Sequence, residues 1–503
     1  MTTAGQQRGA GSAEFSALTD SLTRRLTVAT EAPTETKWLN STVGHTSQKM
    51  MLLLLATSLM MPAARTVRYV RCSAGAPSAT SDDVLFSPLE AKLADAMAGY
   101  MLRPAQKPAS APEPTLPTIR HGLAPRAGVT FYRDGNAWCP FCERVWLQLL
   151  ENGEEYGTVI VDIGAKKPPW YTDAVPTGQT PSAVVDGTVI WESLDIMVAL
   201  EERKDTGARP LLPAEPDERA RVVAELRAFD DPEKGLNVGG AGYAFMRGAP
   251  FGQVPDEGGE SDAKVAALRA AFEQKLTRLE ERLARVEDSP YFEAEFGVLD
   301  IALWPVMERM AAGLPAFRGY AIRNQPGFPR ISAWLHAMGE RPTVARVRSD
   351  DGTLVRLFAK VFGMKGNRSW GDSLVLVRGS KPALEAAAKL VRNRREVVDD
   401  ILLHSQLGKG GLGGLSRSET AEVVEVAIAL VAARLAAAPP PDVTRLIEDA
   451  QQRAAAAGVV CVALAFLRAR VSAPRDMTAA AATALRRACA EEAAEAFDRF
   501  GYV

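Results

Sequence analysis

The chain has 503 residues, which is too long for a single hydrophobic core and indicates about three domains. Its hydrophobic fraction of 47% and charged fraction of 24% are typical of a soluble globular protein, and 59 basic residues nearly balance 61 acidic ones. This balance gives no support to nucleic acid or an anionic membrane as a partner, and five cysteines in so long a chain argue against a disulfide scaffold.

Residues 1–81 have the composition of a leader. An apolar run at 50–64 is too short to span a bilayer but fits the apolar region of a signal peptide. Arg65, Arg68 and Arg71 follow, and no acidic residue occurs between them and Asp82. This order predicts a two-part plastid address, so we expect a plastid protein whose mature form does not bind a membrane. The alternative is a buried apolar helix within the leader of a cytoplasmic protein.

Residues 82–126 are predicted to be a linker with one short helix. The helical pattern at 89–102 is followed by a segment rich in Pro and Ala at 107–117. The compact part of the chain is therefore expected to begin near residue 127.

The stretch Val129–Gly153 predicts a strand, a turn and an amphipathic helix. Alternating apolar residues indicate the strand, Asp134–Asn136 supplies the turn, and Cys139–Cys142 opens the helix. Pro140 suits the first helical position because its missing N–H would be unpaired there anyway. Cys139 then lies just before the first turn, where unpaired N–H groups and the helix dipole favour a thiolate. We therefore predict that Cys139 is a nucleophile.

Further strands and a helix complete a unit predicted at 127–208. Gly157–Ile163 indicates a buried strand. Ala183–Val185 and Thr188–Trp191 indicate a hairpin, because Asp186-Gly187 between them is the strongest two-residue hairpin signal. A helix follows. The order strand, helix, strand, connector, hairpin, helix predicts an α/β unit of thioredoxin-like fold.

Residues 209–345 are predicted to form an all-α domain. Asp262–Glu287 repeats apolar residues at spacings of three and four, which marks one buried helix face. A Gly-rich loop is expected at 235–259. Residues 346–503 are predicted to add an all-α, Ala-rich extension, with helices near 353–362, 382–406, 419–437, 443–456, 459–471 and 477–500.

The close cysteine pair admits three interpretations. As a thiol-transfer site, Cys139 attacks and Cys142, one helical turn later, is close enough to form a disulfide with it. A zinc site needs about four ligands, and the sequence holds no second close Cys or His pair, so no metal is expected. The third interpretation is that the two cysteines are incidental and half-buried. Strand, turn, Cys, Pro and helix together favour the reactive thiol.

Four separated motifs fit one known pattern. Cys139–Arg144, Lys167–Trp170, Thr180-Pro181 before a strand, and Trp191–Ile196 resemble the glutathione site of the cysteine-type glutathione transferases, the omega, lambda and iota classes. Ser289–Ala302 resembles the C-terminal folding motif of the same family. The resemblance covers roughly two fifths of the chain. It implies a thioredoxin-like unit followed by the family's all-α domain.

The resemblance also implies how glutathione is held. Thr180, before a cis-proline at Pro181, pairs with the cysteinyl backbone of glutathione. Ser193 and the helix that it opens receive the γ-glutamyl carboxylate, while Glu192 faces the ammonium group. Lys167 neutralises the glycyl carboxylate. Each feature alone has a simpler interpretation, since a Glu-Ser pair often only caps a helix and a loop lysine is often solvated.

Two features favour the iota class. Omega and lambda enzymes typically carry Ala where this chain has Cys142, whereas a cysteine is typical of iota. The segment Arg468–Met477 resembles the arginine-and-proline motif of the iota extension. The usual Ser or Thr N-cap of the folding motif is Gly297, which tolerates the cap geometry.

The function that the resemblance implies is glutathione-dependent thiol transfer. Cys139 forms a mixed disulfide with glutathione, and the enzyme deglutathionylates a substrate or reduces a dehydroascorbate-type or quinone-type electrophile. Cys142 can resolve the mixed disulfide, and Phe141 contacts glutathione. The second substrate is expected in an apolar groove that includes Trp304 and Phe245, and a homodimer is a further expectation.

Two other functions stay open at this point. One is a prostaglandin-synthase-like enzyme with the same Cys-Pro-Phe-Cys helix, which acts on a lipid. The other is a non-catalytic scaffold of transferase fold that docks a partner through the helical extension.

Overall fold

The structure is a computed structural model. The predicted leader, including the apolar run, and residues 94–126 of the linker lie outside the described residues. The structure therefore does not test the predicted plastid address. The described residues are 85–86, 89–90, 92–93, 128–153, 155–162, 166–203, 209–249, 261–364, 375–409, 414–443, 447 and 449–501.

A four-stranded sheet forms the first unit, in the order β2-β1-β3-β4. Strand β1 pairs in parallel with β2 and antiparallel with β3, and β3 and β4 form the predicted hairpin. Asp186 and Gly187 both have positive φ, 47° and 87°, as a two-residue hairpin turn requires. The thioredoxin-like fold is thus confirmed. The strands span Val129–Arg133 (β1), Tyr156–Ile160 (β2), Ser182–Val185 (β3) and Thr188–Trp191 (β4).

The prediction of a buried strand at Gly157–Ile163 was wrong in length and in burial. Strand β2 ends at Ile160, whose side chain is 43% exposed, and its other residues are half-buried or exposed. The reason is its place in the sheet: β2 is an edge strand with β1 as its single neighbour. An apolar run does not distinguish an edge strand from a central one.

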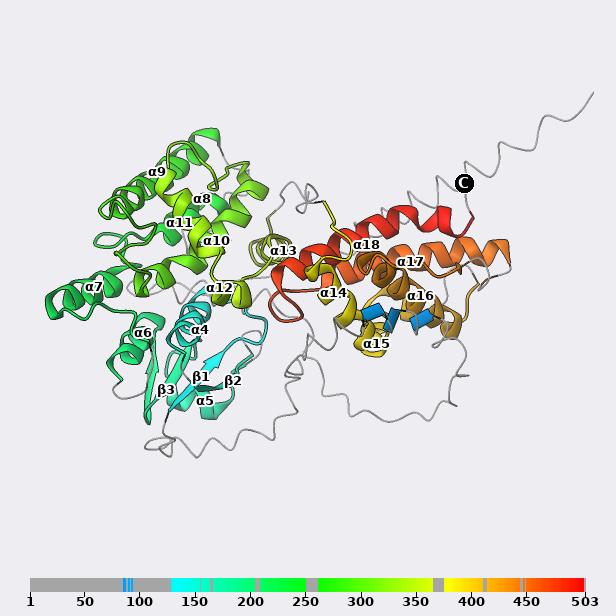
Figure 1. The fold of residues 1–503 in the computed structure, drawn as a ribbon, viewed down its shortest axis with the longest axis horizontal. Coiled ribbons are helices and arrows are strands. Elements are labelled where there is room, and N and C mark those ends of the chain that lie inside the picture. Colours follow the sequence, from blue (N-terminus) through cyan, green and yellow to red (C-terminus); the bar gives the residue numbers. More distant parts are fainter. Residues whose placement is uncertain are drawn as a thin grey trace, which may run out of the picture. The chain divides into compact units, whose positions relative to one another are not determined.

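Helices cover both faces of the sheet (Figure 1). Val129 and Phe131 point to the face covered by α4 (Pro140–Asn152) and α6 (Ser193–Glu202), while Tyr132 and Val184 point to the face covered by α5 (Pro169–Ala174). This alternation follows from the two-residue period of a strand. Cys139 and Cys142 lie in the first of these two cores, so the cysteine helix is part of the packing of the sheet.

The all-α part that follows packs around α10, which is buried along most of its length. The predicted helix at Asp262–Glu287 is confirmed as α9. Helix α13 lies in the predicted extension but packs on α10 and shares its core. The helices are α7 (Pro216–Ala228), α8 (Val238–Arg247), α9 (Asp262–Leu283), α10 (Val298–Arg318), α11 (Pro329–Gly339), α12 (Pro342–Val347) and α13 (Asp351–Phe362).

Helix α8 occupies part of the predicted Gly-rich loop, so that prediction was wrong for 238–247. The side chain of Asn237 caps it by accepting from the Gly240 N–H at 3.2 Å. Its glycines allow close packing: a Cβ at Gly242 would lie 2.5 Å from the Met310 sulfur and 3.1 Å from the Phe272 ring. Glycine has a low helix propensity, and here the packing of α8 against α9 and α10 offsets that cost.

The extension forms a second hydrophobic core of Ala-rich helices. The helices differ from the sequence prediction at two places. The pattern at 382–406 is divided into two helices at Asn393, whereas the patterns at 443–456 and 459–471 are joined by one helix that runs through Gly458. Leu85, Phe86, Leu89 and Leu93 of the predicted linker are buried in this core. The helices are α14 (Lys381–Arg392), α15 (Arg394–His404), η1 (Gln406–Lys409), α16 (Arg417–Leu435), α17 (Ala450–Arg470) and α18 (Ala479–Arg499).

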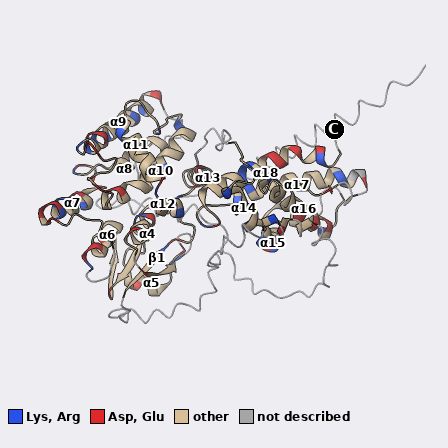
Figure 2. Cartoon of the chain, viewed as in Figure 1, with Lys and Arg blue, Asp and Glu red and all other residues tan. Residues whose placement is uncertain are grey.

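Basic and acidic residues are interspersed along the described helices (Figure 2), in keeping with the balanced composition. Within the described part of the chain, one helical segment, Gln452–Arg470, is long and apolar enough to cross a membrane. It belongs to α17, which packs against α16 and α18 in the core of the extension, and buried helices of soluble proteins meet the same criterion.

Candidate functional site

Cys139 is the N-cap of α4, as the sequence predicted. Its sulfur accepts a hydrogen bond from the Cys142 N–H at 3.3 Å, and Pro140 stands at the first helical position. The thiol also lies 3.7 Å from the carbonyl oxygen of Thr180, to which it donates. Both cysteines are buried, Cys139 completely. The structure therefore brings together the two cysteines and Thr180 and places the Cys139 sulfur at the positive end of a helix.

A carboxylate that the sequence analysis did not identify lies beside the thiols. Asp134 is fully buried, and one of its oxygens accepts from the Trp138 N–H at 2.8 Å. Its Oδ1 is buried without a hydrogen-bond partner in the described part of the chain. A carboxylate oxygen of Asp134 and the two sulfurs lie within 4.8 Å of one another. The sequence signal was weak, since an Asp in a turn before a helix is ordinarily a turn residue.

The surroundings of Cys142 favour its protonated form. Burial raises the pKa of the Cys142 thiol well above its usual range, and hydrogen bonding to Cys139 and the charges of Cys139 and Asp134 raise it further. A thiol with a raised pKa is a poor nucleophile at neutral pH, because the thiolate is the attacking species. The Cys139 sulfur, in turn, lies at the helix N-terminus and accepts the Cys142 backbone N–H.

Of the residues expected to hold glutathione, Thr180 contacts Cys139, and Glu192 and Ser193 stand at the start of α6. The Thr180-Pro181 peptide bond is cis, as the resemblance implied. Thr180 Oγ1 and Ser193 Oγ are both buried, and neither has a hydrogen-bond partner among the residues that the structure describes. Glu192 precedes α6 with a φ of 79°, which is unusual for a residue other than glycine. Buried hydroxyls of this kind ordinarily have a partner.

Lys167 and Phe141 are less tightly tied to the thiols. Lys167 is half-buried, and its ammonium donates to the Asp162 carbonyl at 2.5 Å. Burial lowers the pKa of Lys167, while the charge of Asp162 opposes this effect. Phe141 is partly buried against the core, with the Arg144 guanidinium 5.2 Å from its ring centre. The structure thus leaves the contacts of these two residues with glutathione as predictions.

The expected groove for a second substrate is not lined by Trp304 and Phe245. Both are buried in the core of the all-α part. The Trp304 ring packs against that of Trp334, and the Phe245 ring packs against those of Phe272 and Tyr320. Aromatic residues at helical spacing were here core residues, which the sequence pattern does not separate from groove residues.

A buried charge network supports the loop that precedes Cys139. Arg309 on α10 contacts Glu143 on α4 at 2.7 Å and its neighbour Glu308 at 3.1 Å, and its other amino group donates to the Trp138 carbonyl at 3.0 Å. All three charged side chains are almost completely buried. Burial raises the pKa of Glu143 and Glu308, and the charge of Arg309 opposes the rise. No local sequence pattern indicates this network, because Glu143 and Arg309 are 166 positions apart in the chain.

The folding motif depends on a glycine and an aspartate. Asp300 accepts from the Gly297 N–H at 3.0 Å, from the Phe292 N–H at 3.2 Å and from the Trp334 indole at 2.8 Å. Burial raises the pKa of Asp300 to about 7, although these three hydrogen bonds oppose the rise. A Cβ at Gly297 would lie 2.8 Å from the Leu211 carbonyl oxygen. Glycine is therefore required here by packing and is not merely tolerated as a cap.

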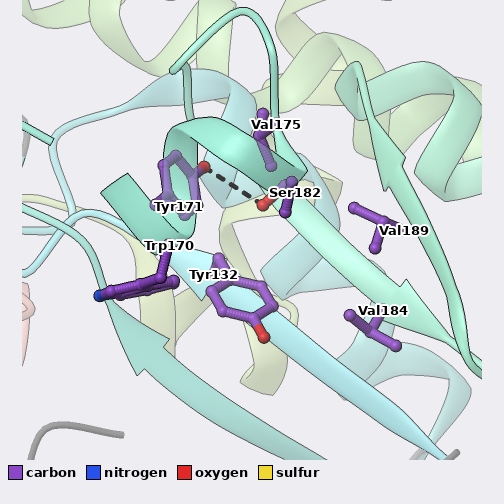
Figure 3. Close-up of a pocket in the computed structure, with 8 residues that line it drawn as sticks. Tyr132, Trp170, Tyr171, Val175, Ser182, Val184 and Val189 are labelled. Carbon is purple, nitrogen blue, oxygen red and sulfur yellow. Dashed lines mark hydrogen bonds between the residues drawn. The ribbon is translucent and has the colours of Figure 1, made fainter. Parts of the chain in front are cut away.

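A small pocket on the other face of the sheet lies apart from the thiols. Tyr132 and Val184 from the strands and Trp170 and Tyr171 from α5 line it, and the Tyr171 and Ser182 hydroxyls are 3.2 Å apart (Figure 3). The Tyr171 hydroxyl also donates to the Gln179 carbonyl. The hydroxyls of Tyr171 and Ser182 are thus close enough to pair with each other, and that of Tyr171 is also bonded to the backbone.

Comparisons with known proteins agree with this architecture. Residues 138–203 match the family "Glutathione S-transferase, N-terminal domain", and residues 262–337 match "Glutathione S-transferase, C-terminal domain". These two regions of the chain are thus similar to the two domains of glutathione S-transferases. They do not extend to the helices after residue 337.

Similar proteins cover slightly less than half of the chain. Glutathione S-transferase L3 of Arabidopsis thaliana is 27% identical over 44% of this chain and 84% of its own length. Glutathione S-transferase L2, chloroplastic, of the same plant is 23% identical over 44% of this chain and 67% of its own length. The solved structure of glutathione transferase Omega 3C from Trametes versicolor is 24% identical, covers 47% of this chain and 91% of that chain, and superposes with a TM-score of 0.38.

Proposed function

We propose that this protein is a glutathione-dependent thiol transferase in which Cys139 is the attacking group. The observation that carries the proposal is the placement of the Cys139 sulfur, which accepts the Cys142 N–H at the N-terminus of α4 and lies beside the Thr180 carbonyl. An accepting sulfur at a helix N-terminus is the arrangement that stabilises a thiolate. The two matched transferase domains and the glutathione transferases among the relatives support the same function.

The polar groups around the sulfur suit a tripeptide with two carboxylates. Thr180 Oγ1 and Ser193 Oγ are buried hydroxyls without partners in the described part of the chain. Ser193 begins α6, so a carboxylate placed there would receive a hydroxyl and backbone N–H groups together. We assign the γ-glutamyl carboxylate to this helix start, its ammonium group to Glu192, and the glycyl carboxylate to Lys167.

The reaction proceeds by two exchanges at sulfur. The Cys139 thiolate attacks the glutathione sulfur of a mixed disulfide, so that a Cys139–glutathione disulfide forms and the substrate leaves as a thiolate that takes up a proton. A second glutathione thiolate then attacks the glutathione sulfur of the adduct, which releases oxidised glutathione and restores Cys139. The mixed disulfide and one free glutathione are thus converted to the free substrate thiol and oxidised glutathione. An electrophile such as dehydroascorbate or a quinone instead takes up two electrons and two protons, which two free glutathione molecules supply as they form oxidised glutathione.

Cys142 is not needed for this cycle. Its raised pKa keeps it protonated at neutral pH, which disfavours attack on the mixed disulfide. We therefore propose that the one-thiol route dominates, and that Cys142 serves mainly as a hydrogen-bond partner of Cys139.

Two cysteine variants test the proposal. Cys139→Ser should abolish reduction of a glutathione mixed disulfide, whereas Cys142→Ser should keep most of it. Intact-mass measurement after incubation with oxidised glutathione should show one adduct of glutathione mass, mapped to Cys139. Unchanged turnover in Cys139→Ser, or an adduct at Cys461 or Cys489 instead, would refute the assignment.

One observation favours a second candidate, the non-catalytic scaffold. Cys139 has no exposed surface in this structure. A glutathione-resin experiment separates the two functions: retention that is lost in Ser193→Ala supports the transferase, and absence of retention supports the scaffold. Iota-class membership, a plastid location and a homodimer remain part of the proposal and rest on the sequence motifs.

A further inference from the structure

A loop of the extension contacts the loop that carries Cys139. The Trp138 indole N–H donates to the Ser472 hydroxyl at 3.2 Å, and the Arg475 guanidinium donates to the Asn136 side-chain oxygen at 3.1 Å. More than 330 residues separate the partners in each pair. The segment 472–476, between α17 and α18, thus contacts the residues just before the nucleophile.

The extension loop is itself held in place. Asp476 accepts from the Ser472 backbone N–H at 2.8 Å and pairs with the Arg475 guanidinium through both of its oxygens. The Ser349 hydroxyl donates to the Ala473 carbonyl at 2.9 Å. Ser472 is buried, so its hydroxyl is a fixed acceptor.

Ser349 joins the loop to the buried charge network by a second route. Its backbone N–H donates to Glu308 at 2.7 Å. Glu308 pairs with Arg309, and Arg309 donates to the Trp138 carbonyl at 3.0 Å. Two hydrogen-bonded routes therefore run from the 472–476 loop to Trp138, one directly to the indole and one through α10.

Trp138 is bonded at each of its polar groups. Its backbone N–H donates to Asp134, its carbonyl accepts from Arg309, and its indole donates to Ser472. Cys139 is the next residue and adopts the extended backbone of an N-cap, with φ −73° and ψ 116°. Fixing Trp138 fixes the start of this N-cap, and with it the direction in which the sulfur meets the Cys142 N–H.

We propose that Ser472 and Arg475 of the extension are positioning residues for the Cys139 thiol. This inference rests on the proposed function, and it assigns the extension a role in the transferase reaction. Loss of the Ser472 hydroxyl leaves the Trp138 indole N–H unpaired and loosens the loop. The sulfur then spends less time at the helix N-terminus, where it reacts.

The test measures the reactivity of Cys139 in the full chain without glutathione. Ser472→Ala should slow the alkylation of Cys139 by iodoacetamide about three- to tenfold, the rate equivalent of about one hydrogen bond, as read by fragment-ion mapping of the peptide. Ser472→Thr, which keeps the hydroxyl, should restore the rate to within about twofold of the native value. The kcat for mixed-disulfide reduction should fall by the same factor as the alkylation rate, with an unchanged KM for glutathione.

Arg470→Ala is the matched control. Arg470 ends α17 near the same loop, but its guanidinium pairs with Asp400 at 2.8 Å in an exposed ion pair. This variant should alkylate at the native rate. Urea unfolding followed by tryptophan emission should still show one cooperative transition for Ser472→Ala, with a midpoint only slightly below that of the native chain because one indole N–H loses its partner, which separates positioning from a loss of fold.

The outcomes divide cleanly. A slower alkylation that Ser472→Thr restores supports positioning, even if glutathione turnover is absent and the proposed function fails. A native rate in Ser472→Ala and Arg475→Ala would overturn the inference while leaving the proposed function intact. A faster rate would also overturn it, because the loop would then shield the thiol.

Discussion

Substitution of Arg309 by Met probes the buried network behind the cysteine loop. Methionine fills much of the same volume but removes the guanidinium, which contacts Glu143 at 2.7 Å, Glu308 at 3.1 Å and the Trp138 carbonyl at 3.0 Å. The side chains of Arg309, Glu143 and Glu308 are 1%, 3% and 4% exposed. The variant therefore removes this donor from two buried carboxyl groups and from the Trp138 carbonyl, while the Ser349 N–H still donates to Glu308.

The expected loss of unfolding free energy at neutral pH is about 3 to 5 kcal/mol, the range for removal of one partner from a buried ion pair. Part of this loss should depend on pH. Arg309 is the main opposing charge that limits the pKa rise of Glu143, so its removal raises that pKa further. The native variant then binds a proton that the unfolded chain releases at neutral pH. Its stability should therefore rise as pH falls toward the unfolded value of 4.5, by up to about 1.4 kcal/mol per pH unit for each proton.

Urea unfolding at pH 7.5 and pH 5.5, followed by tryptophan emission, measures both effects. All eight tryptophans precede residue 371, so the signal reports on the part of the chain that contains the network. Arg323→Met is the control, since Arg323 pairs with Asp351 at 3.4 Å with both side chains about half exposed, and it should change stability by about 0.5 kcal/mol or less.

A second substitution in the same network keeps the test informative if Arg309→Met unfolds. Adding Glu308→Gln to Arg309→Met removes one of the two carboxylates and should recover part of the loss. A loss below about 1 kcal/mol for Arg309→Met, or an equal loss at both pH values, would refute the reasoning.

Three further predictions concern the folding motif and the proposed glutathione pocket. Gly297→Ser should lower the unfolding midpoint in urea although serine is the usual cap, because its Cβ would meet the Leu211 carbonyl; an unchanged or higher midpoint would contradict the packing argument. The free energy of unfolding should fall as pH rises from about 4 to about 7 and then level off. The reason is that burial raises the pKa of Asp300 to about 7, so the native state keeps a proton that the unfolded chain releases. Asp300→Asn should flatten this part of the plot of unfolding free energy against pH. Ser193→Ala should raise KM for glutathione about tenfold and leave the rate of Cys139 alkylation unchanged, and a slower alkylation would mean that Ser193 acts on the thiol itself.

Local features were predictable from sequence. The hairpin followed from Asp186-Gly187, and the N-cap position of Cys139 followed from Pro140 and the apolar spacing behind it. In each case the residues that fix the geometry are neighbours in the chain, so pattern and structure depend on the same few dihedral angles. The glycine-rich helix α8 was missed because its stability comes from packing on α9 and α10, which no local pattern contains.

The supporting residues of the site could not be predicted in this way. Arg309 reaches Trp138 across 171 positions, and Ser472 reaches it across 334. An arginine within a buried helix and a serine in a loop have ordinary sequence environments. Trp304 and Phe245 were expected to line a groove for the second substrate, but both are buried in the core.

The geometry of the site therefore depends both on the helix N-terminus at Cys139 and on residues that are distant in the chain. The N-terminus of α4 places the Cys139 sulfur against a backbone N–H, and a carboxylate oxygen of Asp134 lies within 4.8 Å of both sulfurs. Cys142 experiences both the charge and the burial, which hold its proton in place, while Cys139 also accepts the backbone N–H that its position provides. The difference in reactivity that we propose between the two thiols then depends on how precisely the Cys139 sulfur is held at the helix N-terminus. Trp138 restrains this position through its hydrogen bonds to the turn, to α10 and to the extension.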